Sequence, residues 1–95
     1  MSSSKISIVK SVKRQLTELN CSLKNKKLKS EEFEHINNKI SCLENVLPEL
    51  EKQLDFNGCF DYIVGRIEWY KHMGEHTKIG SIKVEDSISV LTKLL

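Results

Sequence analysis

A ladder of apolar residues in the second quarter of the chain repeats at alternating intervals of three and four positions. Its members are Phe33, Ile36, Ile40, Leu43, Leu47, Leu50 and Leu54. This spacing places one narrow apolar stripe along a helix, as in helices that bury one edge against another helix. The ladder is long for a chain of 95 residues and therefore determines the expected architecture.

The composition agrees with a folded helical protein. Apolar residues make up 39% and charged residues 29% of the chain, which is typical of soluble globular domains. The chain has only four glycines and one proline. Because these residues favour turns, their scarcity favours helices over an all-β fold. A chain of this length builds a thin core and often gains stability by self-association. We therefore expect one all-α domain over residues 1–95.

The apolar periodicity and the turn residues divide the chain into helices. These are predicted at about residues 5–26, 31–55, 59–75 and 84–95. A serine among residues 2–4, Ser30 and Asn57 are expected to cap the first three, because their side-chain oxygens accept hydrogen bonds from free backbone N–H groups. Gly65, inside the third helix, costs about 1 kcal/mol relative to alanine. Close approach of a neighbouring backbone is its expected compensation.

Pro48 interrupts the second predicted helix. It removes one backbone hydrogen bond and crowds the carbonyl group of Glu44, so the helix either ends near Leu47 and restarts or bends and continues. The apolar ladder keeps its phase across the proline, and Pro48 lies on the outward side, where water can satisfy the freed carbonyl. We therefore predict one bent helix.

The short link between the first two helices, about five residues, makes them antiparallel neighbours. Residues 1–29 are strongly basic and residues 30–62 mainly acidic, so complementary charge is expected to favour this pairing. The predicted fold is an antiparallel, coiled-coil-like helical hairpin with two shorter helices packed on it as a small helical bundle. The last helix is expected to bury Val84, Ile88, Leu91 and Leu95. Two short helices cannot cover the whole hairpin, so part of the long stripe is expected to remain bare for self-association or for a partner helix.

The third predicted helix has two apolar-rich faces. One carries Phe60, Ile63, Ile67 and Tyr70, and the other carries Tyr62, Arg66, Trp69 and Met73. Tryptophan, tyrosine and arginine are the residues most enriched in interface hot spots. The candidate partner interface is therefore Tyr62, Arg66, Trp69, Tyr70 and Met73. In the alternative interpretation, Trp69 and Tyr70 fill the core of the bundle.

Basic residues of the first helix and of the following link form a candidate anion-binding set. The set is Lys10, Lys13, Arg14, Lys24, Lys26, Lys27 and Lys29. Such side chains engage phosphates, but this stretch has no glycine-rich phosphate loop and no aromatic residue to stack on a base. The net charge of +2 is also mild for a nucleic-acid-binding protein. A solvated helix surface beside an acidic neighbour explains the same pattern.

No metal site is predicted. His72, Glu75 and His76 match the His-x-x-Glu-His spacing of one class of zinc peptidases. However, Gly74 weakens the helix that must hold both histidines, and few residues follow to supply a third ligand. A polar helix end, where histidine suits the negative end of the helix dipole, is the simpler interpretation.

No catalytic residue is predicted either. Cys21, Cys42 and Cys59 are widely spaced, without a CxxC pair, and indicate reduced thiols of a cytoplasmic protein. The sequence shows neither a neighbouring base nor a cause for a lowered thiol pKa, so we interpret them as small packing residues. No apolar run approaches the roughly 20 residues that a membrane span needs, and no membrane association is expected.

The sequence thus predicts a non-enzymatic helical protein–protein interaction module: an adaptor, a chaperone-like protein or a small inhibitor that binds a protein partner or copies of itself. The alternative is a small protein that binds nucleic acid or an anionic nucleotide through the basic first helix and the 24–29 link. Neither function implies a cofactor.

Overall fold

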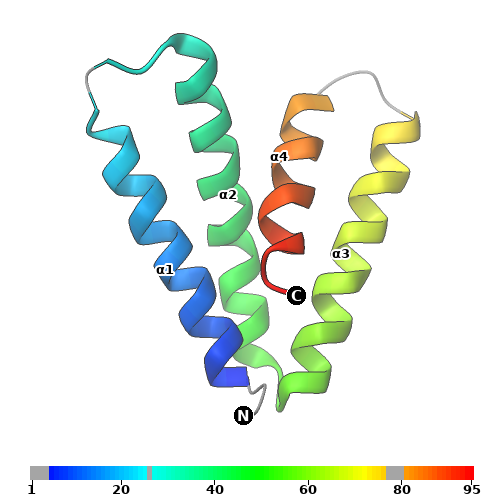
Figure 1. Cartoon of the computed structure of the whole chain (residues 1–95). Helices are drawn as coiled ribbons and strands as arrows, with labels where there is room; N and C mark the ends of the chain where they lie inside the picture. The colour runs from blue at the N-terminus through cyan, green and yellow to red at the C-terminus, as the bar shows by residue number, and fades with distance from the viewer. Residues whose placement is uncertain (1–4, 26, 77–80) are drawn as a thin grey trace.

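The computed structural model describes residues 5–25, 27–76 and 81–95, and every regular element among them is a helix (Figure 1). The helices are α1 (Lys5–Leu23), α2 (Ser30–Lys52), α3 (Phe56–His76) and α4 (Ser81–Thr92). The predicted all-α fold, a small helical bundle, is confirmed. Each predicted helix is present, with its ends shifted by a few residues.

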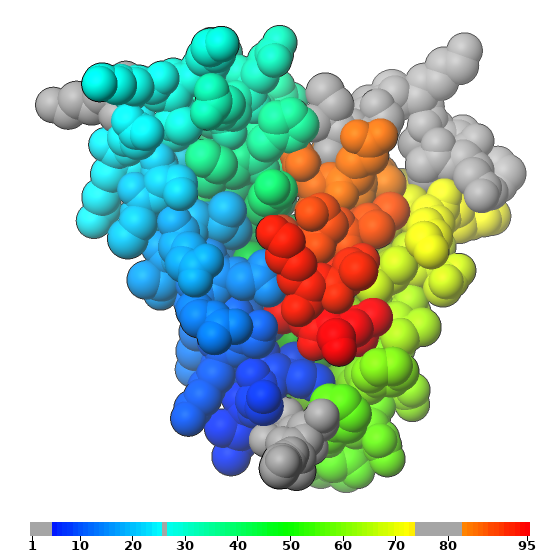
Figure 2. Space-filling model, in the orientation of Figure 1, coloured from blue at the N-terminus to red at the C-terminus, as the bar shows by residue number. Residues whose placement is uncertain are grey.

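The helices do not pack in the order of the chain. α1 and α2 form the expected antiparallel hairpin, while α4 lies between α2 and α3, which touch each other little (Figure 1). α1, α2 and α3 converge at the end of the molecule where α1 and α3 begin, called here the basal end. On the face shown in Figure 2, the C-terminal residues lie beside the first turns of α1 and α3 at this end. The bundle measures 39 × 33 × 20 Å.

The core draws on all four helices. Its buried members are Ile8, Val12, Cys42, Leu43, Val46, Leu50, Cys59, Ile63, Ile67, Val90, Leu91 and Leu94. Cys42 and Val46 lie off the apolar ladder and are nevertheless buried, because α4 covers a second side of α2. The two ends of the ladder remain uncovered as expected, since Phe33 is 49% exposed and Leu54 is 98% exposed.

The third helix is longer than predicted. α3 has 21 residues and α1 has 19, so only α4, with 12, is a short helix packed on the hairpin. α3 begins three residues before the predicted start because Asp55, rather than Asn57, caps it: the Gly58 N–H donates to Asp55 Oδ1 at 2.9 Å. The prediction of Asn57 as the cap was therefore wrong.

The second helix begins without the predicted serine cap and passes through its proline. Lys29 occupies the cap position and makes no side-chain capping bond, so the expected role of Ser30 was wrong. The backbone N–H of Phe33 instead donates to the carbonyl of Lys29 at 3.0 Å. Pro48 lies on an exposed position within α2, and the predicted continuous helix is confirmed.

Two further expectations were wrong for reasons of packing. Gly65 is exposed, and no described atom lies within 4 Å of an added Cβ, so no close backbone contact compensates for it. Leu95 lies beyond the end of α4 and is 56% exposed. Asp86 and Ser87 are buried instead, because α4 is covered from two sides.

The expected charge pairing across the hairpin is not found. Among the described residues no ion pair joins α1 to α2. A polar link between them is instead directed at the backbone: Lys5 Nζ donates to the carbonyl of Glu51 at 2.6 Å. The two helices are therefore held together chiefly by apolar packing. The predicted serine cap at residues 2–4 lies outside the described residues.

Candidate functional site

Four residues on one face of α3 form a contact cluster, called here the α3 cluster: Tyr62, Arg66, Trp69 and Tyr70. The Arg66 guanidinium carbon lies 4.2 Å from the centre of the Trp69 ring and 5.0 Å from that of Tyr70. Arg66 Nη2 donates to the Tyr70 hydroxyl at 3.2 Å, and the rings of Trp69 and Tyr70 meet edge to face at 5.0 Å. Positions three and four apart on a helix are neighbours, which is why the sequence brought these residues together correctly.

The α3 cluster has a buried side and an exposed side. Tyr62 and Tyr70 pack against the core, whereas Trp69 is 44% exposed, so the interpretation of Trp69 as a core residue was wrong. Burial raises the pKa of Tyr62 above its ordinary value of 10.0, while the Arg66 cation acts in the opposite direction. Met73, the last predicted member, is half-buried one turn beyond Trp69.

Arg66 is held in place without full hydrogen bonding. Its Nε is buried and has no hydrogen-bond partner among the described residues. A buried donor without a partner destabilises a fold by about 1–3 kcal/mol, and such groups are few in native structures. Arg66 thus occupies a position that core stability alone does not favour.

The cysteines are not arranged for nucleophilic chemistry. Cys42 and Cys59 are buried, and burial raises the pKa of both thiols above 9.0. The Cys42 thiol points to the carbonyl of Ser87 at 4.0 Å, and that of Cys59 to the carbonyl of Leu50 at 3.5 Å. Both thiols therefore pack in the core as neutral groups, while Cys21 is exposed.

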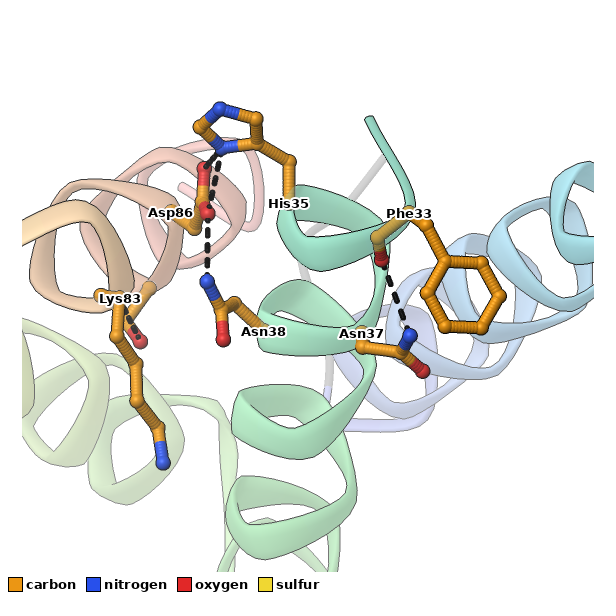
Figure 3. A network of polar contacts seen from close by, with 7 residues as sticks. Phe33, His35, Asn37, Asn38, Lys83 and Asp86 are labelled. Carbon is orange, nitrogen blue, oxygen red and sulfur yellow. Dashed lines mark hydrogen bonds and ion pairs between the residues drawn. The ribbon is translucent and has the colours of Figure 1, made fainter. Parts of the chain in front are cut away.

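A polar network between α2 and α4 was missed by sequence reasoning. His35 Nδ1 lies 2.9 and 2.8 Å from the two carboxylate oxygens of Asp86, and Asn38 Nδ2 donates to Oδ2 at 3.2 Å (Figure 3). Because a carboxylate only accepts, Nδ1 carries the proton. The other ring nitrogen points away from Asp86 (Figure 3). No local spacing signals a pair 51 positions apart.

This network links α2 to α4. A carboxylate that orients a histidine also occurs in catalytic and metal sites. Here no group of three metal-ligating side chains exists among the described residues. The His-x-x-Glu-His motif is described only in part, because the side chains of Glu75 and His76 lie outside the described residues.

The structure divides the predicted anion-binding set. Lys24, Lys27 and Lys29 lie in or beside the α1–α2 link, at the end of the hairpin opposite the basal end (Figure 1). Lys10 and Arg14 instead border an open groove together with Lys93, which follows α4 directly. Lys13 is exposed elsewhere on α1, and Lys26 lies outside the described residues. The set is therefore not one surface, and sequence reasoning missed Lys93.

No helix in the described part of the chain combines the length and the apolar character required to traverse a lipid bilayer. Comparison with protein-family models, with curated proteins and with solved structures gives no match for this chain.

Proposed function

We propose that this chain is a non-catalytic helical protein–protein interaction module that docks partners through the α3 cluster. The observation that supports this function best is the half-exposed indole of Trp69 with the Arg66 guanidinium lying over its ring. Tryptophan, arginine and tyrosine are enriched in binding hot spots. An adaptor, a chaperone-like protein or a small inhibitor each acts in this way.

Preorganisation favours the α3 cluster as a docking surface. Binding is weakened by about 0.5–1.5 kcal/mol for each flexible side chain that must be immobilised. Arg66 is already fixed by its ring contacts and by its bond to the Tyr70 hydroxyl. A partner therefore gains the contacts of Arg66 and Trp69 with little ordering of their side chains.

A second copy of the chain is one partner within this proposal. Trp69 of the α3 cluster is 44% exposed, and Met73 lies half-buried one turn beyond it. Self-association would cover them, and small helical chains commonly gain stability in this manner. The proposed assembly is a homodimer or a larger oligomer.

The test compares Trp69→Ala with Phe33→Ala, because both residues are aromatic and similarly exposed but lie on different helices. Light scattering after size exclusion, over a range of concentrations, reports self-association against a monomer of 11.0 kDa. Quantitative capture from the cells that make the protein reports other partners. We expect Trp69→Ala to lose a partner or the oligomer that the wild type and Phe33→Ala retain. Identical behaviour of the two variants in both assays would refute the α3 cluster as the docking surface.

A second candidate function is binding of nucleic acid or of an anionic nucleotide. Its support is the exposure of the basic side chains at the hairpin tip, Lys24, Lys27 and Lys29. Reversing the charge of these lysines and of Lys26 is expected to abolish nucleic-acid retention, if the function exists, and to leave partner capture unchanged. Retention that decreases steeply with salt would support it.

A further inference from the structure

The basal end carries an open groove with a basic rim and an apolar floor, called here the basal groove. It has a volume of about 660 Å³ and lies between α1, α3 and the C-terminal end of α4. Its lining includes the cations Lys10, Arg14 and Lys93, called here the rim, and the apolar side chains of Phe56, Phe60 and Leu94, called here the floor. Ligand sites in proteins commonly measure about 300–1,000 Å³. The basal groove is therefore large enough for one small organic molecule.

The rim concentrates positive charge without neutralising it. Lys10 and Arg14 lie four residues apart on α1, where like charges repel, and Lys93, directly after α4, adds a third cation. No acidic side chain lines the basal groove, and none of the three cations forms an ion pair with any described residue. A bound anion would relieve this repulsion.

The floor supplies apolar and aromatic surface directly beside these cations. The rings of Phe56 and Phe60 lie 5.9 Å apart at a tilt of 35°, and Phe60 is 39% exposed. Water leaves such a surface favourably when an apolar group covers it, at about 25 cal/mol per Å². The basal groove thus presents two complementary chemistries in one place.

We propose that the basal groove binds a small amphiphilic anion, a molecule with an apolar body and one carboxylate or phosphate head. The body covers Phe56, Phe60 and Leu94, while the head lies at the rim beside Lys10, Arg14 and Lys93. The site is separate from the α3 cluster, and the inference does not depend on the proposed docking function.

The test uses three probes of equal chain length on the full chain: decanoate, decyl phosphate and the neutral decanol. Backbone amide shifts in NMR titrations report affinity and location together. We expect saturable binding of at least one anion, with the largest shifts at residues 7–14, 56–60 and 93–95, and weaker binding at higher salt. The two anions distinguish a carboxylate ligand from a phosphate ester. Decanol binding as tightly as both anions, or shifts centred elsewhere, would overturn the proposal.

Matched variants separate the roles of rim and floor. Arg14→Gln and Lys93→Gln are each expected to weaken anion binding about five-fold, which corresponds to one exposed ion pair, and to leave decanol unaffected. Phe60→Ala is expected to weaken all ligands. Lys13→Gln, a neighbouring charge outside the rim, and Trp69→Ala are the controls and should bind as the wild type does. Equal losses in Lys13→Gln and Arg14→Gln would refute the assigned site. Unchanged cooperative unfolding shows that each variant is folded.

Discussion

The clamp between α2 and α4 is expected to make a measurable contribution to stability. Asp86 is 7% exposed and receives hydrogen bonds from His35 and Asn38. Hydrogen bonds to a charged group contribute about 1.5–3 kcal/mol when buried. The His35 side chain is 45% exposed, so solvent screening reduces the expected coupling of His35 and Asp86 to about 1 kcal/mol.

A double-mutant cycle isolates this coupling from the effects of each residue alone. The variants are His35→Ala, Asp86→Ala and their combination, and the free energy of unfolding is measured by urea denaturation. Asp86→Ala should cost about 2 kcal/mol, because Asn38 also loses its acceptor, and His35→Ala about 1 kcal/mol. A change of 1 kcal/mol corresponds to about 4–8 °C in Tm for a domain of this size.

The exposed pair Lys52–Glu49 serves as the control cycle. Its atoms are 3.1 Å apart, close to the His35–Asp86 distance, but its carboxylate side chain is 43% exposed, whereas that of Asp86 is 9% exposed. Pairs of this kind contribute about 0.3–0.5 kcal/mol. A His35–Asp86 coupling no larger than that of the control would show that the clamp does not hold α4, and our account of the network would be wrong.

Other predictions concern the thiols, the core and the proline. Because burial raises the pKa of Cys42 and Cys59, an alkylating reagent at neutral pH should label Cys21 first and the other two only on unfolding, as counted by mass spectrometry. The folded protein therefore holds these two thiol protons more tightly than the unfolded protein does. The resulting stabilisation is complete below pH about 8.5 and is lost as the pH rises through the folded pKa. Urea midpoints that stay constant up to pH 10 would contradict this expectation. Leu43→Ala should cost about 2–5 kcal/mol in urea denaturation, and a cost under 1 kcal/mol would refute its central place in the core. Pro48→Ala should raise the free energy of unfolding by about 1–2 kcal/mol, since it restores a helix hydrogen bond at an exposed position. A free energy of unfolding below that of the wild type would show that the proline is required.

Helix content was predictable because its signals are local. The three-four ladder from Phe33 to Leu54 depends only on helix geometry, and it located α2 to within a few residues. The same locality explains why Arg66 and Trp69 were correctly placed on one face of α3. Tyr70, which was assigned to the other apolar-rich face, contacts both of them. Helix starts were less predictable. Ser30 is a suitable cap for α2, and both Asp55 and Asn57 are suitable caps for α3, and the residue types alone do not show which position the backbone uses.

Features that join distant parts of the chain were beyond sequence reasoning. The burial of Cys42 depends on α4 covering a second side of α2, which no periodicity within α2 reveals. The pairing of His35 with Asp86 and the addition of Lys93 to Lys10 at the basal groove also require the packed bundle. The network and the basal groove therefore became visible only in three dimensions.

The central position of α4 also bears on the order in which the protein can fold. α2 and α3 follow one another in the chain but touch little. The apolar side chains between them come from α4, notably Val90 and Leu91, and from Leu94 just beyond it. Hydrogen bonds between α2 and α4 join positions 45 to 51 residues apart. The entropy lost in closing such long loops must be offset before these contacts stabilise the protein. A nascent chain that ends at α3 leaves the apolar sides of three helices in water. Placement of residues 86–94 between α2 and α3 is therefore needed to bury the apolar sides of these helices.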